Sequence, residues 1–438
     1  MSIEKKCNTK GEQIDNFFGK VCGQYGYESG LVERKSELSA SKLAQGLILG
    51  SLKTPTATLN QFCQVLEELD VSISESGLHY RLNAKTVTFM EKLTAYALAQ
   101  WHDKQAIDIE LLRRFRAVRL LDSSQFKLPD ALADYFRGTT KASMKVSLCY
   151  EFISGRFEAI ELASGKRPDQ TNPVMTQDIL PGSLTITDLG FFNQDVFDQF
   201  HQQGAYFLSR LKLQAGVYDR PDSPKQLELA RLLSHKTGTH GECRVYLGSQ
   251  KRIPVRLIYE RLPKAVIEKR RRKAKAAAKR QGKTCATWVL DLLAWTFYVT
   301  NIPESLASAD ELRALYRLRW QIELIFKLWK SYARLDAIGK WRLERVLCQF
   351  YARLLALLLF QWLAMAHRWT AGGELSLPKA LQFMQSKADR LILALQIGWR
   401  ELDRQFLSIQ NGFRRFAIKQ KRRKHPSTLD LLVRVSEP

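Results

Sequence analysis

The chain lacks the cysteine patterns typical of a disulfide-stabilised secreted protein or of a zinc site. Its seven cysteines are scattered, odd in number and never spaced as CxxC. This pattern disfavours a disulfide framework and a zinc site. The cysteines are Cys7, Cys22, Cys63, Cys149, Cys243, Cys285 and Cys348.

Long hydrophobic runs are also missing. The longest, Leu354 to Ala366, is interrupted by Gln361 and is too short to span a bilayer. The first residues do not show the basic segment and apolar run of a secretory signal. We therefore expect a cytoplasmic, nucleoid-associated protein with no membrane partner.

Acidic residues are scarce relative to basic ones. The chain has 44 Asp and Glu against 68 Lys and Arg, a net charge of +24 and a pI near 9.8. Such an excess implies a polyanionic partner, with nucleic acid as the first candidate and an acidic membrane surface as the second. With 438 residues, of which 45% are hydrophobic, two or three domains with filled cores are expected.

Residues 1–105 show helical patterns and few strand signals. Ser72-x-x-Glu75 is typical of a capping box that opens a second short helix after the one around Phe62. Two short helices with a tight joint fit a helix-turn-helix, and they fit any small helical bundle equally well. We predict a helical DNA-binding domain here. The first helix is predicted by one apolar stripe: Leu59, Phe62, Cys63 and Leu66.

Residues 106–212 have the pattern of a mixed α/β sheet. Two short apolar runs each end at an aspartate, Asp122 and Asp188, and Ser154-Gly155 signals a hairpin between them. A strand, hairpin, strand and helix succession is typical of a mixed sheet. The predicted elements are strands at 117–121, 143–152, 156–162, 183–187 and 205–211, and a helix at 193–202.

Residues 213–303 depart from this pattern and predict a β-rich insertion. Strand-like runs at 243–247, 253–259 and 288–300 are split by the segment 264–283, which has ten basic residues against one acidic residue. Residues 304–335 return to a helical pattern. The C-terminal region, 336–438, is predicted to be helical; its segment from Trp341 to Trp369 is apolar on nearly every face, which implies burial against other helices or another subunit.

The most informative segment runs from Tyr316 to Lys330. At about 100° per residue its polar side chains fall within a sector of roughly 80° on one helix, opposite an apolar face. Charged helix faces are usually only solvated. A carboxylate flanked by cations also suits metal-assisted chemistry on a phosphodiester. The polar set is Tyr316, Arg319, Glu323, Lys327 and Lys330.

This spacing resembles the signature of the insertion sequence 4 family of bacterial DDE transposases: Tyr, two residues, Arg, three residues, Glu, six residues, Lys. The strings LLDSSQFKLP around Asp122 and TITDLGFF around Asp188 resemble the family's first two catalytic motifs. The resemblance implies an α/β catalytic core of ribonuclease H-like fold, interrupted by a β-rich insertion and flanked by α-helical N- and C-terminal regions.

The resemblance implies that Asp122, Asp188 and Glu323 form the catalytic triad. Three carboxylates suit a pair of Mg²⁺ ions, which prefer hard oxygen ligands, with Mn²⁺ as a substitute. No small-molecule cofactor is expected. An Asp at a strand end is otherwise commonly a turn former.

The family pattern implies DNA contacts for the bases and aromatics around the triad. Tyr316, Arg319 and Lys330 would contact phosphates. Lys327 lies outside the signature, and we expect its side chain to be an ordinary solvent-exposed charge. Trp295 would stack on a flipped base if cleavage passes through a DNA hairpin, although a Trp in an apolar run is commonly core. Further DNA contacts are predicted for Arg210, Lys212, Arg270, Arg271, Arg272 and Lys273.

The expected function is a cut-and-paste transposase. It would bind the element ends as a homodimer on double-stranded DNA, cleave them by hydrolysis and join the 3′-hydroxyls to target DNA. Two basic runs, 264–283 and 414–426, would contact phosphates without reading bases. A nuclease or resolvase of the same fold, and a non-catalytic DNA-binding protein derived from a transposase, remain the alternatives.

Overall fold

The fold is mixed α/β, with one nine-stranded sheet and many helices. The computed structural model describes residues 9–33, 37–102, 107–139, 141–234, 238–365, 368–370, 373–420 and 426–436. The strand order is β3-β2-β1-β4-β5-β9-β8-β7-β6. The strands are β1 (Val118–Lys127), β2 (Ser143–Glu151), β3 (Arg156–Ser164), β4 (Leu184–Thr187), β5 (Tyr206–Arg210), β6 (Val217–Tyr218), β7 (His240–Leu247), β8 (Ile253–Arg261) and β9 (Trp295–Thr300).

Strand β1 lies in the first half of the sheet and organises it. It pairs antiparallel with β2 and parallel with β4, and β4 pairs parallel with β5. The predicted hairpin of β2 and β3 is confirmed, and its turn contains Gly155 at φ +72°, a backbone conformation that favours glycine. Leu120 and Leu121 alternate between two separate cores, one on each face of the sheet.

The first predicted strand is too short. We expected it to end at Asp122, but β1 continues to Lys127 because residues from Ser123 onward still pair with β2. Only the pairing with β4 stops, at Leu120. Asp122 therefore lies where β1 leaves its parallel neighbour.

The predicted insertion continues the same sheet. Strand β9 pairs antiparallel with β5 on one side and with β8 on the other, so β8, β7 and β6 extend the sheet outward. The predicted strand over 288–300 is wrong in its first half, because residues 287–292 form a helix, α11, that packs on α9 and β9. The basic segment forms a helix, α10, with no buried residue. These helices are α9 (Leu229–Ser234), α10 (Lys264–Arg280) and α11 (Thr287–Leu292).

The N-terminal region is helical. The two short helices around Phe62 and His79 are present, but the predicted capping box at Ser72 is wrong: Ser74 caps α5, and the Glu75 side chain instead accepts a hydrogen bond from Asn60 at 3.2 Å. Helix α4 carries a capping box of its own, between Thr58 and Gln61. The helices are α1 (Lys10–Asn16), η1 (Phe17–Val21), α2 (Cys22–Glu28), α3 (Ala40–Lys53), α4 (Leu59–Glu68), α5 (Glu75–Arg81) and α6 (Ala84–Gln100).

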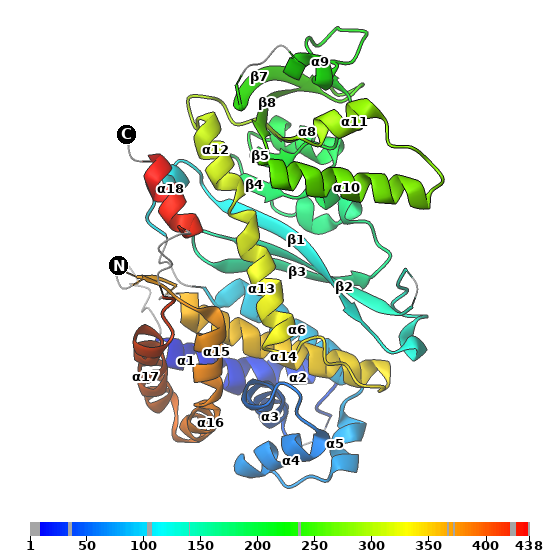
Figure 1. Cartoon of the computed structure of the whole chain (residues 1–438). Coiled ribbons are helices and arrows are strands. Elements are labelled where there is room, and N and C mark those ends of the chain that lie inside the picture. The colour runs from blue at the N-terminus through cyan, green and yellow to red at the C-terminus, as the bar shows by residue number, and fades with distance from the viewer. Residues whose placement is uncertain are drawn as a thin grey trace.

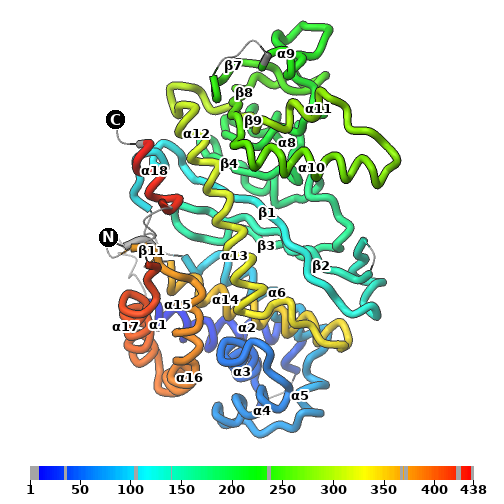
Figure 2. The backbone as a smooth tube through the Cα atoms, viewed as in Figure 1, coloured from blue at the N-terminus to red at the C-terminus, as the bar shows by residue number. Residues whose placement is uncertain are grey.

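Helices α14 to α17 pack beside the N-terminal helices, and Figures 1 and 2 show the two groups together at the lower end of the molecule. Helices α12, α13 and α18 lie higher, beside or over the sheet. Two short strands, β10 (Trp369–Thr370) and β11 (Gly373–Glu374), also belong to the C-terminal region. The basic run 414–426 falls partly on 421–425, which lie outside the described residues. The helices are α12 (Ala309–Tyr316), α13 (Arg319–Ser331), α14 (Leu343–Met365), α15 (Leu377–Gln385), α16 (Ala388–Ile397), α17 (Trp399–Phe416) and α18 (Thr428–Ser436).

Helix α14 is the central helix of this lower part. It is longer than the apolar run seen in the sequence and is apolar enough to cross a membrane, but 89% of its most apolar window is buried inside the protein. It packs against α3, α6, α15 and α17 of its own chain. The apolar segment thus serves as a core helix within one chain.

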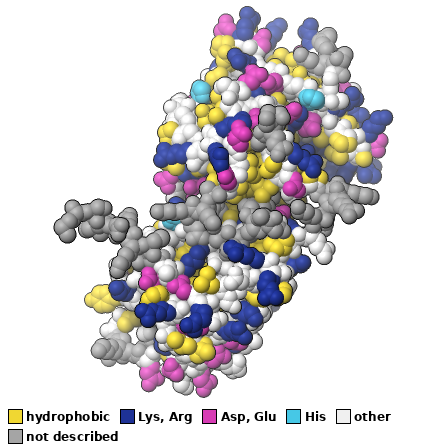
Figure 3. Space-filling view, turned by 90° about the vertical axis from the view of Figure 1, so that its left-hand side faces the viewer, with side chains coloured by type: hydrophobic (Ala, Val, Ile, Leu, Met, Phe, Trp, Pro, Cys, Tyr) yellow, Lys and Arg dark blue, Asp and Glu magenta, His cyan; other side chains and the backbone are white. Residues whose placement is uncertain are grey.

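Within the described residues, two further short α-helices and four 3-10 turns precede or connect the strands of the first half. None of the cysteines in the described part of the chain forms a disulfide, and Cys7 lies outside it. On the face shown in Figure 3, basic side chains are spread over both ends of the molecule with acids between them. The connecting helices include α7 (Glu110–Arg113) and α8 (Gln194–Gln202), and the 3-10 turns η2 (Asp130–Leu132), η3 (Asp169–Thr171), η4 (Pro173–Met175) and η5 (Leu189–Phe191).

Candidate active site

Asp122 and Asp188 occupy matching positions on neighbouring parallel strands. Leu120 pairs with Ile186 in the last step of the β1–β4 register. Each aspartate lies two residues further along the chain, so both lie just beyond the last paired residues of β1 and β4, a position that we call the catalytic edge. The Asp122 carboxylate accepts a hydrogen bond from the Ser123 amide at 2.8 Å, and that of Asp188 accepts from the Gly190 amide at 2.8 Å.

Glu323 reaches this edge from helix α13, which crosses over β1 (Figure 1). It is half-buried and forms an ion pair with Arg319 at 2.5 Å, one turn earlier on the same helix. The charges of both other acids act on the pKa of Asp122. The pKa of Asp122 is raised to about 7, mainly by burial and in smaller part by the charges of Asp188 and Glu323, against the opposing effects of the Ser123 hydrogen bond and of Arg319.

The donor chemistry of this edge fits a divalent cation. Carboxylate oxygens are the ligands that Mg²⁺ and Ca²⁺ prefer, and a cation would relieve the penalty on an ionised, buried Asp122. Within the described residues, however, no three His, Cys, Asp or Glu side chains are already close enough to share one metal ion. Glu323 pairs with Arg319 instead.

Tyr316 does not lie on the same helix as Glu323. The predicted single helix is broken at Arg317 and Leu318: α12 ends at Tyr316 and α13 begins at Arg319. The Tyr316 side chain is buried, where we expected an exposed stripe, and its ring lies 4.8 Å from that of Tyr298 on β9. Its buried hydroxyl makes no hydrogen bond within the described part of the chain.

The Tyr316 hydroxyl lies near two positively charged side chains, Arg319 and Arg210. Burial raises its pKa above the usual range, and the charges of Arg319 and Arg210 act in the opposite direction. Arg210 ends β5 and pairs across the sheet with Tyr298. The described structure therefore brings Tyr316, Arg319 and Arg210 together beside Asp188.

Lys330 lies at the far end of α13. Its ammonium donates to the Gln125 carbonyl at 2.7 Å and stands 4.8 Å from the centre of the Phe126 ring. Burial lowers the pKa of Lys330. Lys330 thus lies along β1, beyond Asp122, whereas Lys327 is exposed as expected of a solvated charge.

Comparison with known proteins shows the family of the chain. A family described as Transposase DDE domain matches residues 113–359, more than half of the chain. The transposase of IS231B from Bacillus thuringiensis subsp. berliner is 30% identical over 433 residues, covering 92% of this chain and 90% of its own. That of IS231F from B. thuringiensis subsp. israelensis is 31% identical, covering 82% and 80%. This chain belongs to the DDE transposase family.

Two more distant similarities accompany these. The IS1151 transposase of Clostridium perfringens is 26% identical, covering 92% of this transposase and 91% of its own chain. Among solved structures, the piggyBac transposase synaptic complex with hairpin DNA aligns with a TM-score of 0.45 and 8% identity, covering 94% and 86% of the two chains. Family membership carries DNA binding and dependence on a divalent metal ion.

The other sequence-predicted residues of this transposase divide into two groups. Trp295 opens β9 and is half-buried, with its ring 5.9 Å from that of Tyr259. Arg270 donates to the Trp295 carbonyl at 3.2 Å and Arg271 to the Leu290 carbonyl at 2.9 Å, so both help to anchor α10. The exposed group is Lys212, Arg272 and Lys273.

Sequence reasoning missed Tyr298, which packs on Tyr316. Burial raises the pKa of Tyr298, and Arg210 and Arg270 are both near enough to lower it in part. The only sequence signal was its position three residues after Trp295 in an apolar strand. Its neighbours in space come from β5, α10 and α12, which no local pattern connects.

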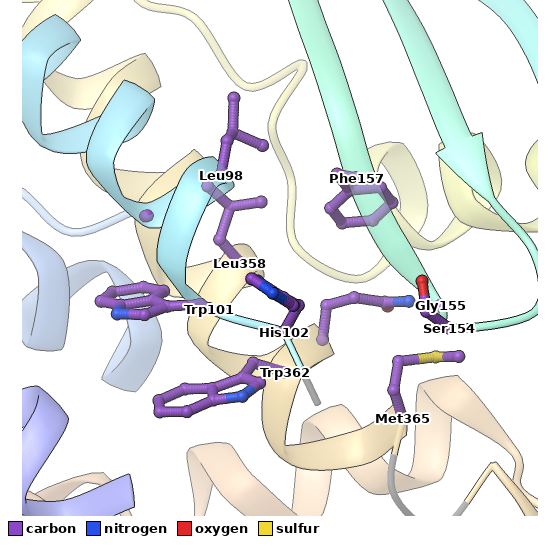
Figure 4. A pocket seen from close by; sticks show the side chains of 11 residues that line it. Leu98, Trp101, His102, Ser154, Gly155, Phe157, Leu358, Trp362 and Met365 are labelled. Carbon is purple, nitrogen blue, oxygen red and sulfur yellow. The ribbon is translucent and has the colours of Figure 1, made fainter. Parts of the chain in front are cut away.

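Two cavities in the described part of the chain lie away from these acids. One, of about 20 Å³, lies between the apolar side chains of α6, α14 and the β2–β3 turn and has room for a single water (Figure 4). The other is an open groove beside Pro129 and Trp341. Asp122, Asp188 and Glu323 line neither of these cavities.

Asp122→Asn is expected to stabilise the metal-free protein at pH 8. The raised pKa of Asp122, about 7, means that the native state keeps a proton that the unfolded chain loses near pH 4, so native stability falls as pH rises between these values. The variant escapes this loss. Its free energy of unfolding in EDTA should exceed that of wild type by about 2 kcal/mol at pH 8 and by little at pH 4.

Urea titrations at both pH values measure this difference. Asp134→Asn, at an exposed position, is the control and should show no gain at either pH. A gain for Asp122→Asn that is equal at pH 4 and pH 8 would contradict the burial argument.

Proposed function

We propose that this transposase cleaves the ends of an insertion sequence with Asp122, Asp188 and Glu323 as its metal-binding catalytic residues. The observation that carries the proposal is the placement of two aspartates at matching positions of adjacent parallel strands, with Glu323 facing them from α13. The chain would also belong to the insertion sequence 4 family. Two Mg²⁺ ions would be used, with Mn²⁺ as a substitute.

The strand arrangement supports a ribonuclease H-like core. In the order β3-β2-β1-β4-β5, the first three strands form an antiparallel meander, and β4 and β5 run parallel to β1. In this division residues 106–212 and 304–335 form the core, residues 213–303 are the insertion, and residues 1–105 and 336–438 are the helical regions. The N-terminal region would read the element ends and the C-terminal region would support a homodimer.

The proposed mechanism assigns separate tasks to the side chains at the sheet edge. When bound, divalent ions would supply activation of the attacking oxygen and stabilisation of the leaving oxygen. Asp122 and Asp188 would hold these ions from the sheet, and Glu323 would become a further ligand once it separates from Arg319. Arg319 is then free to pair with a phosphate, which offers a guanidinium a comparable bidentate partner.

Three other groups would hold the DNA in this mechanism. The unpartnered Tyr316 hydroxyl can donate to a phosphate oxygen beside Arg319 and Arg210. Lys330 would act further along β1. Trp295 would stack on a flipped base if cleavage passes through a hairpin; its half-buried ring leaves part of its surface available.

Helix α10 is proposed as a DNA-backbone contact. It has no buried residue, is docked through Arg270 and Arg271, and carries Arg272 and Lys273 on its exposed surface, with Lys212 a further contact near β5. A helix that contributes nothing to the core but carries this much positive charge suits a polyanion.

Strand transfer distinguishes a transposase reaction from hydrolysis alone. The protein is incubated with labelled element-end DNA, a supercoiled target plasmid and Mg²⁺, and products are separated on denaturing gels. We expect nicked ends, released ends and ends joined to plasmid through their 3′-hydroxyls; a hairpin intermediate would appear as a slow, foldback species. Cleavage without joined product would favour the nuclease or resolvase alternative, and binding without cleavage would favour the non-catalytic one.

A further inference from the structure

The first part of the loop between β3 and β4, residues 165–175, is hydrogen-bonded to strands β1 and β2 next to the proposed catalytic edge. Gln125 on β1 donates to the Gly165 carbonyl at 2.9 Å, and Lys145 on β2 donates to the Arg167 carbonyl at 2.5 Å. Asn172 donates to the Ser147 hydroxyl of β2. Side chains of the two strands thus fix this loop at several points.

Asp169 is the point where this loop meets the strand that carries Asp122. One carboxylate oxygen, Oδ1, accepts from the Ser123 hydroxyl at 2.7 Å and from the Lys145 ammonium at 2.9 Å. The Lys145 side chain is only 8% exposed, so its charge needs a partner. Asp169 supplies that partner and also accepts a hydrogen bond from Ser123, the residue next to Asp122.

The other oxygen of Asp169, Oδ2, faces the turn that follows Asp188. A Cβ placed on Gly190 would lie 3.1 Å from Asp169 Oδ2 and 3.1 Å from Asp188 Oδ1. The two carboxylates therefore flank the same glycine, and any side chain there would press on both. The next loop residue, Gln170, accepts from Asn193 at the start of α8 through its carbonyl at 2.9 Å.

Asp169 lies behind the catalytic edge. Because side chains alternate along β1, Ser123 points to the face of Leu121, opposite to the face of Leu120 and α13. Lys145 neutralises Asp169 there, so Asp169 adds little negative charge to the acids in front. Its contacts join the Asp122–Ser123 segment to the Asp188–Gly190 turn.

We propose that Asp169, held by Lys145, is a positioning residue that sets the separation of Asp122 and Asp188 for metal binding. This rests on the proposed function of those two aspartates. Asp169 does not touch the reacting atoms; it fixes the backbone on which the two ligands stand. Groups that orient metal ligands from behind commonly contribute about 10- to 100-fold to metal affinity.

Mn²⁺ binding to the full-length protein tests this, followed by the electron paramagnetic resonance signal of free Mn²⁺. Asp169→Asn should weaken Mn²⁺ binding at least about tenfold, and Ser123→Ala, which removes one of the hydrogen bonds, by a smaller factor. Both variants should bind end DNA in EDTA as wild type does.

The matched control is Glu158→Gln. Glu158 pairs with Arg119 at 2.6 Å on the same face of the sheet. The Glu158 side chain is 19% exposed and that of Arg119 is 6% exposed, close to the 24% of Asp169 and the 8% of Lys145. It should lower the melting temperature about as much as Asp169→Asn does but leave Mn²⁺ affinity unchanged.

The inference is overturned if Asp169→Asn binds Mn²⁺ like wild type, or if Glu158→Gln weakens binding equally. Asp122→Asn and Asp188→Asn distinguish a failure of the proposed catalytic site from a failure of the proposed role of Asp169. If these also keep full Mn²⁺ affinity, the proposed catalytic site itself fails; if only they lose it, the site stands and the role of Asp169 fails.

Discussion

Glu323→Gln is expected to abolish end cleavage while leaving folding and DNA binding intact. If Glu323 is a metal ligand, its loss should slow cleavage on the order of 10³-fold or more, which corresponds to about 4 kcal/mol of transition-state stabilisation. The amide keeps the shape of the side chain but is a poor ligand for a hard cation.

The structural cost of this change is small. The ion pair with Arg319 is an i,i+4 contact between partly exposed side chains, a type that contributes about 0.5 kcal/mol or less. Removing a negative charge next to Arg319 and Arg210 should, if anything, tighten DNA binding. A large loss of cleavage could therefore not be explained by unfolding or by lost affinity.

Single-turnover cleavage of labelled end DNA measures the rate, and a gel-shift titration in EDTA measures affinity. Glu304→Gln, at an exposed position just before α12, is the control and should cleave at the wild-type rate. Cleavage by Glu323→Gln at the wild-type rate would remove Glu323 from the mechanism. A fall in DNA affinity equal to the fall in rate would assign it to binding.

Glu151→Ala is expected to cause the largest loss of stability. Its carboxylate is 6% exposed and accepts hydrogen bonds from the amides of Val118 at 3.0 Å, Ile153 at 3.0 Å and Ser154 at 2.7 Å, and from the Ser154 hydroxyl at 2.6 Å. Truncation leaves these donors without their acceptor next to the start of β1. We expect a loss of about 4 kcal/mol in the free energy of unfolding.

Urea titration monitored by tryptophan fluorescence measures this loss. Glu151→Gln, which keeps one acceptor oxygen, should lose roughly half as much. A loss within about 1 kcal/mol for Glu151→Ala would show that water reaches the freed amides and that this carboxylate is not a structural anchor of β1.

Local pattern was enough to predict the hairpin, the strands that lead to Asp122 and Asp188, and the helix that carries Glu323. These features depend on alternation, turn residues and helical spacing within short windows. The end of β1 was predicted wrongly because pairing with β2, a separate segment, extends it past Asp122. The break at Arg317 was missed because a two-residue interruption hardly disturbs helical periodicity.

The surroundings of the acids depend on contacts between distant segments, which a single sequence does not reveal. In the sequence, Asp169 is one polar residue in a loop and Lys145 is one charged residue in a strand. Their contact with each other and with Ser123 forms only when β1, β2 and the loop pack together. Tyr298 and Arg210 likewise become neighbours only through the pairing of β5 with β9. The roles of the individual site residues stay predictions until the variants are measured.

The continuous sheet limits how this protein could be divided. Strand β9 fills the edge that β5 would otherwise expose, so the insertion and the catalytic half share hydrogen bonds through β5, β9 and β8. A fragment without residues 213–303 would leave β5 as an open edge beside Arg210, a template on which other chains could assemble. A chain shortened in this way would therefore be prone to aggregate through β5.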